Sequence, residues 1–233
     1  RYPDLLIEGC SGGGGRFDAG MLYYTPQIWC SDNTDAVERI KIQYGTSFAY
    51  PSCTVGSHVS AVPNHQTGRT TELATRAAVA MAGSFGYELD LNLLTEEEKE
   101  QVREQIKNYH RFEMLIRQGR YYRLTDVWQK KEYAAWEYCR PDGSEALVTV
   151  VTLNTQCNPA TEYVKLRGLG EDKKYRVEVV GMQTGGENGQ RINGTPNAVE
   201  PEYYTGAQLV YAGVPVPRLG NEYKSWQVYV KEV

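Results

Sequence analysis

Two short stretches of this chain combine residue types that could do chemistry. Cys10 precedes a glycine run at residues 12–15, and Asp32 follows Trp29. Consecutive glycines let backbone amides approach a ligand closely, and a thiol can line a sugar pocket. An indole near a carboxyl group can lower the local polarity and raise the carboxyl pKa, as a general acid requires. Together these residues predict a polar rim with acid–base chemistry.

Each of these residues also has a structural interpretation. Asp32 stands among good N-cap residues, Ser31 and Thr34 included, and capping is its commoner role by about two chances in three. A flexible turn is somewhat favoured for the glycine run, and a buried small hydrophobic side chain is favoured more strongly for Cys10. Arg16 and Asp18 could orient a substrate, but an ion pair between Arg16 and a carboxylate that fixes the glycine loop is the favoured interpretation. On pattern alone these alternatives stay open.

Other site chemistries receive no support. No Gly-Lys-Ser/Thr follows the glycines, and the Gly-x-Gly-x-x-Gly spacing is absent, so no phosphate loop or dinucleotide site is predicted. The histidines His58, His65 and His110 match no metal-ligand spacing, and no Gly-x-Ser-x-Gly elbow occurs. His58 could line the pocket at the end of the third strand, but a hydrogen-bonded histidine in the core is favoured over that role by roughly three to one. Glu8 and Asp35 read as structural, and neither a metal nor a cofactor is expected.

Strand and helix patterns alternate along the first half of the chain and must position these residues. Small and acidic residues follow the first two apolar runs, as at the carboxyl ends of buried parallel strands. A capping box, Thr95 with Glu98, opens a long helix that Gly119 closes. The alternation predicts about half of an eight-unit (β/α)8 barrel over residues 1–118. The expected strands are residues 5–8, 27–30, 54–62 and 84–89, and the expected helices are residues 35–44, 71–81 and 95–118.

The pattern becomes antiparallel after Gly119. The tripeptide Pro141-Asp142-Gly143 separates two apolar runs and predicts a hairpin. Residues 119–233 are therefore predicted to form a separate antiparallel β-sandwich, with a solvated loop at residues 185–189. The further strands expected in it are residues 162–167, 175–180, 208–211 and 226–231.

Composition narrows the class of protein. The net charge of −4 and the absence of a Lys/Arg run argue against nucleic-acid binding. No apolar run is long enough to cross a bilayer, and no signal peptide precedes the fold. Five cysteines, an odd number without short paired spacing, argue against a disulfide framework. We therefore expect a cytoplasmic protein without membrane contact.

An ordered series of motifs runs through residues 10–69. It comprises Cys-Ser-Gly-Gly-Gly from position 10, Arg-Phe-Asp from 16, Gly-Met-Leu-Tyr-Tyr from 20, Ser-Asp-Asn-Thr-Asp-Ala from 31, Gln-Tyr-Gly-Thr-Ser from 43 and His-Val-Ser-Ala-Val-Pro-Asn-His-Gln from 58. This series resembles α-galactosidases of glycoside hydrolase family thirty-six. The rest of the chain resembles the family in pattern, with fewer diagnostic residues.

The resemblance implies a role for three residues. The aspartate of the Ser-Asp-Asn-Thr-Asp motif, here Asp32, is the general acid/base and proton donor. Cys10 lies against the galactose, and Gly13 is a backbone contact. The family's nucleophilic aspartate, in a Trp-Asp-Met-Asn motif, has no counterpart in this chain. We therefore expect the chain to begin near the fifth barrel strand of a longer enzyme, and to be inactive alone.

The activity implied is retaining hydrolysis of terminal α-galactosyl residues of melibiose- and raffinose-type oligosaccharides, by a homo-oligomer (a tetramer). Two enzymatic alternatives are α-N-acetylgalactosaminidase and galactosyl transfer. Cys10 weakly favours plain galactose, because little room would remain for an acetamido group. A non-enzymatic alternative makes the sandwich a carbohydrate-binding or oligomer-forming module, with Trp128, Trp136 and Trp226 as stacking residues, although core packing is commoner by about four to one.

Overall fold

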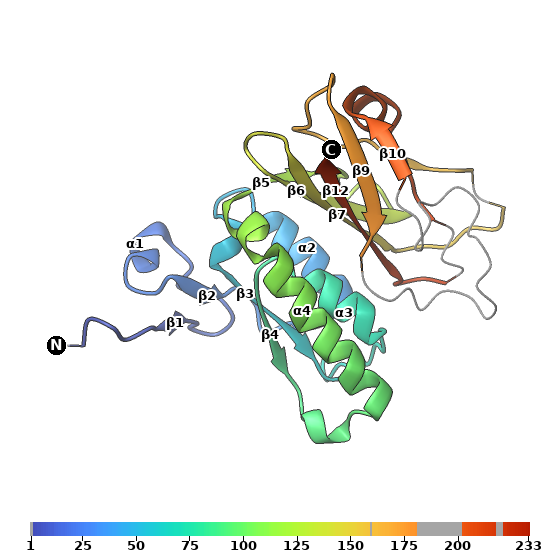
Figure 1. The fold of residues 1–233 in the computed structure, drawn as a ribbon. Helices are drawn as coiled ribbons and strands as arrows, with labels where there is room; N and C mark the ends of the chain where they lie inside the picture. Colours follow the sequence, from blue (N-terminus) through green and yellow to red (C-terminus); the bar gives the residue numbers. More distant parts are fainter. Residues whose placement is uncertain (1, 159, 181–201, 218–220) are drawn as a thin grey trace. The chain divides into compact units, whose positions relative to one another are not determined.

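The computed structural model describes residues 2–158, 160–180, 202–217 and 221–233 (Figure 1). The chain divides into two compact units, Arg1–Thr95 and Glu96–Val233. Across the described ranges, no helix combines the length and apolar character needed to cross a bilayer. The loop expected at residues 185–189 lies outside the described residues.

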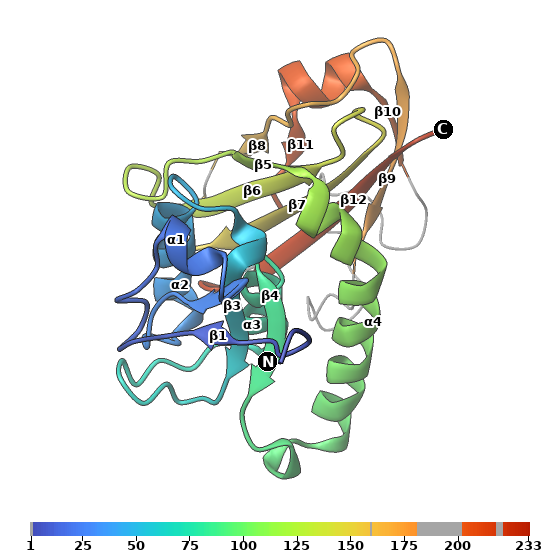
Figure 2. The same ribbon diagram turned by 90° about the vertical axis from the view of Figure 1, so that its left-hand side faces the viewer.

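The first unit is built on a parallel sheet whose strands follow one another in sequence order, β1-β2-β3-β4 (Figures 1 and 2). Three of the strands, β2 to β4, and both longer helices lie where the sequence predicts them, whereas β1 shares only Glu8 with the strand expected at residues 5–8. The elements are β1 (Glu8–Gly9), α1 (Ala19–Leu22), β2 (Gln27–Trp29), α2 (Ala36–Thr46), η1 (Ser52–Thr54), β3 (Val55–Ser60), α3 (Leu73–Ala80), β4 (Ser84–Glu88) and η2 (Leu91–Leu93).

The two faces of this sheet differ in chemistry. On the face toward α2 and α3, Val55 and Val59 are buried, and the Ser57 hydroxyl donates to Gln43 of α2 at 3.0 Å. The opposite face carries polar and aromatic side chains, and two glycines make room for them. A Cβ on Gly56 would lie 2.7 Å from Oε1 of Glu8, and one on Gly86 would lie 2.8 Å from the His58 ring. The alternation therefore separates an apolar core from a polar face.

The second unit contains a six-stranded antiparallel sheet, in the order β10-β9-β12-β7-β6-β5, and a two-stranded sheet of β11 and β8. The predicted hairpin is confirmed: β6 pairs with β7, and Gly143 has φ +71°. Trp226 and Tyr175 are among the side chains of its apolar core. The elements are α4 (Glu96–Gln118), β5 (Arg120–Arg123), β6 (Tyr133–Cys139), β7 (Glu145–Thr152), β8 (Tyr163–Val164), β9 (Lys174–Val179), β10 (Glu202–Thr205), η3 (Gln208–Ala212), β11 (Val214–Pro215) and β12 (Ser225–Glu232).

One predicted strand is wrong. Residues 208–211 are helical and form part of η3. Thr205 and Gln208 close the turn reciprocally. The Gln208 side-chain oxygen accepts from the Thr205 backbone amide at 2.8 Å, and the Thr205 hydroxyl accepts from the Gln208 backbone amide at 3.2 Å. Leu209 is fully buried, whereas Tyr211 is exposed. The hydrogen bonds between Thr205 and Gln208 and the burial of Leu209 therefore favour a helical turn, although the apolar run is typical of a strand.

Two helical residues depart from what their types suggest. Glycine often ends a helix, yet Gly45 lies inside α2, and the large apolar side chain of Ile106 in α4 is exposed. α4 also packs with the second unit, because Phe112 lies 5.0 Å from the Tyr229 ring and Arg111 pairs with Glu178. The compact units accordingly divide after residue 95, and a domain boundary after residue 118 stays a prediction.

Candidate active site

The candidate site lies where β1 and β2 end. The two strands are parallel, with Gly9 opposite Ile28, so the loops that follow them leave the same edge of the sheet. A Cβ on Gly13 would lie 2.7 Å from the Asp32 amide nitrogen and 3.1 Å from the Asp32 carboxyl carbon. Gly13 also has φ +72°. Only glycine meets both conditions, and the structure therefore brings Gly13 directly against Asp32.

Backbone contacts hold the glycine loop in place. The Gly15 amide donates to the Ser11 carbonyl at 3.1 Å, and Phe17 stacks on Tyr50 at 4.2 Å. Asp18 caps α1 by accepting from the Met21 amide at 2.8 Å. The predicted ion pair of Arg16 is wrong, since Arg16 forms none with any described residue. The turn is ordered by its own amides and by one aromatic stack.

Asp32 is the one side chain of the loop at residues 31–35 that is left unpartnered. The Asn33 backbone amide donates to the Ser31 hydroxyl at 3.1 Å, and the Asp35 backbone amide donates to the side-chain oxygen of Asn33 at 3.1 Å. The Thr34 hydroxyl accepts from the Asn64 side chain at 3.1 Å. The Asp32 carboxylate is exposed and accepts no hydrogen bond from the part of the chain that the structure describes.

Asp35, not Asp32, is the N-cap of α2. Its Oδ1 accepts from the Val37 amide at 2.8 Å and from the Glu38 amide at 3.3 Å. Its Oδ2 accepts from the Thr67 hydroxyl and lies 2.5 Å from Nη1 of Arg69. Burial raises the pKa of the Asp35 carboxyl, but these hydrogen bonds and the Arg69 charge outweigh it and bring the pKa below its usual value. The capping role weighed for Asp32 is thereby excluded.

Trp29 is held by a buried arginine that sequence analysis did not single out. Arg39 of α2 is 3% exposed, and its guanidinium carbon lies 4.4 Å from the centre of the Trp29 ring. Its Nη1 donates to the Cys30 sulfur at 2.8 Å, and its Nη2 is buried with no partner among the described atoms. Burial raises the pKa of the Cys30 thiol, although Arg39 opposes this. An arginine on an amphipathic helix gives no local sign of such burial.

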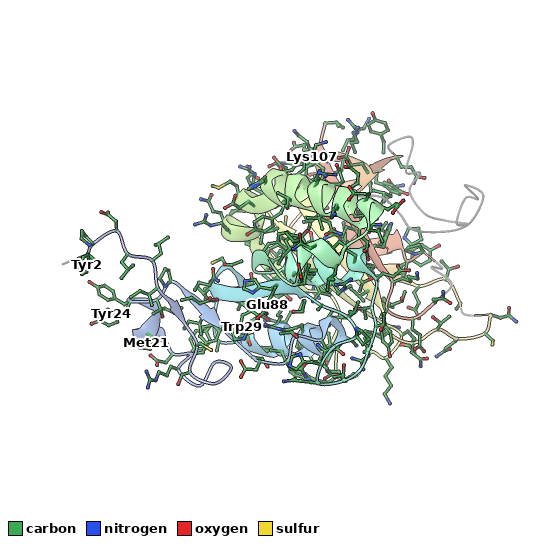
Figure 3. All side chains as sticks on the ribbon, turned by 90° about the horizontal axis from the view of Figure 1, so that it is seen from below. Tyr2, Met21, Tyr24, Trp29, Glu88 and Lys107 are labelled. Carbon is green, nitrogen blue, oxygen red and sulfur yellow. The ribbon has the colours of Figure 1, made fainter. Side chains whose placement is uncertain are left out.

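His58 lies within β3 and is half-buried on the polar face of the sheet. The centre of its ring lies 4.8 Å from that of the Trp29 ring, so both Arg39 and His58 lie close to Trp29. Burial lowers the pKa of His58, while the charges of Glu8 and Glu88 oppose that shift. Figure 3 labels Trp29 and Glu88, which belong to β2 and β4 of this sheet. His58 is thus neither at the end of its strand nor fully inside the core.

Cys10 follows β1 and is an exposed free thiol. The interpretation of Cys10 as a buried small side chain is therefore wrong. Within the described ranges, no group of three or more His, Cys, Asp or Glu side chains is placed to hold a metal ion. What the edge of the sheet presents is one unpartnered carboxylate, a thiol and a glycine loop whose backbone meets that carboxylate.

Two family models match the chain. One, described as melibiase, matches residues 1–119, and the other, the glycosyl hydrolase family 36 C-terminal domain, matches residues 133–230. The chain is 54% identical over its whole length to the bifunctional α-galactosidase/sucrose kinase AgaSK of Mediterraneibacter gnavus. It is 45% identical to α-galactosidase AgaA of Geobacillus stearothermophilus. The chain spans about a quarter of these relatives, 23% and 29% of their respective lengths.

Solved structures give the same result. The galactosidase domain of AgaSK superimposes with a TM-score of 0.88 at 52% identity, and covers all of this chain and 29% of that one. A substituted form of AgaA from Geobacillus stearothermophilus in complex with raffinose superimposes with a TM-score of 0.88 at 43% identity, again over all of this chain and 29% of that one. Another substituted AgaA was solved with stachyose.

Proposed function

Because this chain belongs to the melibiase family of glycoside hydrolases, we propose that it carries the general acid/base of a retaining α-galactosidase. The substrates proposed are oligosaccharides that end in an α-linked galactosyl residue. The names of the relatives support this activity, and the AgaA complexes with raffinose and stachyose support the substrate class. A homo-oligomeric enzyme in the cytoplasm is part of the proposal, and the five free cysteines accord with a reducing compartment.

The observation that carries the proposal is the unpartnered carboxylate of Asp32. A general acid/base must exchange a proton with the substrate and with water, so permanent hydrogen-bond donors would hinder it. In the first step Asp32 protonates the leaving oxygen, and in the second it activates the water that hydrolyses the glycosyl-enzyme. Retention also needs a second carboxylate as nucleophile, about 5 Å away. We assign that nucleophile to no residue of this chain.

Cys10 and Gly13 are proposed as substrate contacts beside Asp32. The exposure of Cys10 and the close approach of Gly13 to Asp32 support this. The parallel sheet is proposed to be half of a (β/α)8 barrel. Its strands keep sequence order, without the reversal that marks a doubly wound sheet. Residues at the carboxyl ends of β1 and β2 are then where barrel enzymes hold their catalytic groups.

The test uses Asp32→Asn and Asp32→Ala in the full-length enzyme that carries these residues. We expect kcat/KM on raffinose to fall by about 10²- to 10⁴-fold, and to fall much less on a dinitrophenyl α-galactoside, whose leaving group needs no proton. Azide should restore turnover of the aryl substrate by Asp32→Ala and give a galactosyl azide of retained configuration. Asp172→Asn, at another exposed carboxylate, is the matched control.

Three outcomes would contradict the proposal. Equal turnover of both substrates by Asp32→Asn, close to wild type, would remove Asp32 from the acid/base role. An inverted first product would exclude the retaining mechanism. Faster turnover of a nitrophenyl α-N-acetylgalactosaminide than of the α-galactoside by the wild-type enzyme would change the substrate class.

A further inference from the structure

We propose that Arg69 and Asn64 are positioning residues that hold Asp32 in its working place by gripping the loop at residues 31–35. Both belong to the turn at residues 64–69, which follows β3 in the chain. The inference rests on the acid/base role proposed for Asp32, and it adds the contacts that keep the Asp32 carboxylate in position.

The turn at residues 64–69 is stabilised by hydrogen bonds among its own residues. The Asn64 amide donates to the Arg69 carbonyl at 2.8 Å, and the Gly68 amide donates to the Asn64 carbonyl at 2.8 Å. The Asn64 side-chain oxygen accepts from the amides of Gln66 and Thr67, each at 3.0 Å. Asn64 is 5% exposed. These contacts give the turn one defined shape, from which its side chains can act as fixed supports.

Two groups of contacts cross from this turn to the loop. The Asn64 side-chain amide donates to the Thr34 hydroxyl at 3.1 Å. Thr67 and Arg69 both donate to Oδ2 of Asp35, with Arg69 at 2.5 Å. The Asp35 side chain is 1% exposed, whereas that of Arg69 is 26% exposed. The loop is thus held at two neighbouring residues, and one of those contacts is a charged hydrogen bond to a buried carboxylate.

These contacts reach Asp32 through the backbone. Asp32 accepts no hydrogen bond from a described side chain, although its charge interacts with that of Arg39. The direction of its carboxylate therefore depends largely on the loop and on the Gly13 backbone beside it. A small pocket is lined by Thr34, Asp35, Asn64 and Arg69, among others. Without Arg69, the buried Asp35 carboxylate would lose its charged partner, and a shift of the loop that exposes this carboxylate to solvent would be favoured. A displacement of about 1 Å at a reacting group can reduce a rate by as much as 10²-fold.

Kinetics on two leaving groups separates this role from a merely structural one. In the full-length enzyme, Arg69→Ala should lower kcat on raffinose by about 10- to 100-fold and leave KM within about twofold. On a dinitrophenyl α-galactoside, which needs no proton from Asp32, the loss in the glycosylation step should stay below about threefold. Arg69→Lys should recover part of the lost activity. Arg103→Ala, which removes an exposed pair with Glu100, is the matched control.

A double-mutant cycle provides the second readout. If Arg69 acts through Asp32, then adding Arg69→Ala to Asp32→Asn should cause little further loss on raffinose. Equal losses on both substrates, full activity of Arg69→Ala, or additive losses in the cycle would each overturn the inference.

A second variant tests the inference if Arg69→Ala does not fold. Thr34→Val removes only the contact with Asn64 and should show the same dependence on the leaving group in weaker form. If Thr34→Val shows no such dependence, the proposal is overturned. The same experiments distinguish failure of the acid/base role from failure of the positioning role. If Asp32→Asn slows both substrates equally, the acid/base role of Asp32 is excluded. If Asp32→Asn depends on the leaving group and Arg69→Ala does not, only the positioning role of Arg69 is excluded.

Discussion

Among the described residues, each of the two units buries one carboxylate, and the two have opposite electrostatics. Asp35 in the parallel unit is 3% exposed and accepts from two backbone amides, a hydroxyl and a guanidinium. Glu137 in the antiparallel unit is fully buried and accepts only from the Arg167 amide, at 2.8 Å, while its Oε1 has no partner among the described atoms. The pKa of Asp35 lies below its usual value, whereas burial raises that of Glu137 to about 8.

The difference shows that the number of donors, rather than burial alone, sets the charge of a carboxyl group. In the parallel unit the donors keep Asp35 ionised, and that charge fastens the loop beside Asp32. In the antiparallel unit the surroundings of Glu137 favour the neutral acid at neutral pH. Asp32 is the third case, exposed and without donors. We expect Asp35 and Glu137 to govern stability, with Asp35 acting on activity only through the loop that carries Asp32, and we expect Asp32 to govern activity alone. Substitutions at Asp32, Glu137, Asp35, Gly12 and Gly13 test that division.

The largest effect is expected at Asp32. Asp32→Asn in the full-length enzyme should lower kcat/KM on raffinose by about 10²- to 10⁴-fold. Its free energy of unfolding should stay within about 0.5 kcal/mol of wild type, because an exposed side chain without partners contributes little. Urea unfolding and steady-state kinetics on the same preparation check both values. A clear loss of stability at Asp32 would break the proposed division.

The next effect is a pH dependence at Glu137. The native state keeps a proton up to a pKa of about 8, whereas the unfolded chain releases it near its ordinary pKa, about 4.3. The contribution of Glu137 to the free energy of unfolding should therefore be greatest below pH 4.3, fall as pH rises to about 8, and level off above. Glu137→Gln, which mimics the neutral acid, should remove this slope and be more stable at pH 8, by on the order of 2–3 kcal/mol.

Unfolding in urea from pH 5 to pH 8.5 measures the slope at Glu137. Glu222→Gln, at an exposed glutamate, is the control and should keep the wild-type slope. A slope that survives in Glu137→Gln would show that another group is responsible.

Asp35→Asn should lower the free energy of unfolding by about 2 kcal/mol near pH 6, because asparagine keeps the cap of α2 but loses the Arg69 pair. The pH dependence has the opposite sign to that of Glu137. A depressed pKa stabilises the native state above the unfolded value, about 3.9, and that contribution is lost as pH falls toward the native pKa. The gap between wild type and variant should therefore shrink from pH 6 to pH 3 in thermal melts. A constant gap would contradict the ionised state of Asp35.

The smallest effect expected is the difference in kcat between alanine substitutions at two neighbouring glycines. Gly12 and Gly13 have similar positive φ angles, +66° and +72°. Alanine at either position should cost about 1 kcal/mol of stability. Only at Gly13 would the new Cβ meet the Asp32 backbone, at 2.7 Å, whereas nothing lies within 4 Å at Gly12. Gly13→Ala should therefore also reduce kcat, by roughly tenfold, and Gly12→Ala should leave kcat unchanged. Equal kcat values would remove the proposed link between the glycine loop and Asp32.

Much of the fold follows from local patterns. The parallel strands show as short apolar runs that end in small or acidic residues, and the hairpin at Gly143 shows through its turn residues. The helical turn at residues 208–212 is missed, because its four-residue apolar pattern suits a strand as well as a buried helical turn. The sequence also cannot separate Asp32 from Asp35 as cap, since both stand before the same helix.

By itself, the sequence determined the order of strands and helices, the glycines that permit a close approach, and the position of Asp32 after an apolar strand. These features depend on residues that are close together in the chain, through their backbone preferences and the spacing at which apolar side chains recur. The tertiary structure decided which carboxylate is partnered. Thr67 and Arg69 lie more than thirty residues from Asp35 in the chain and reach it only when β3 is paired beside β2. Because hydrogen bonds and desolvation act through space, only the folded arrangement leaves Asp32 unpartnered and Asp35 held.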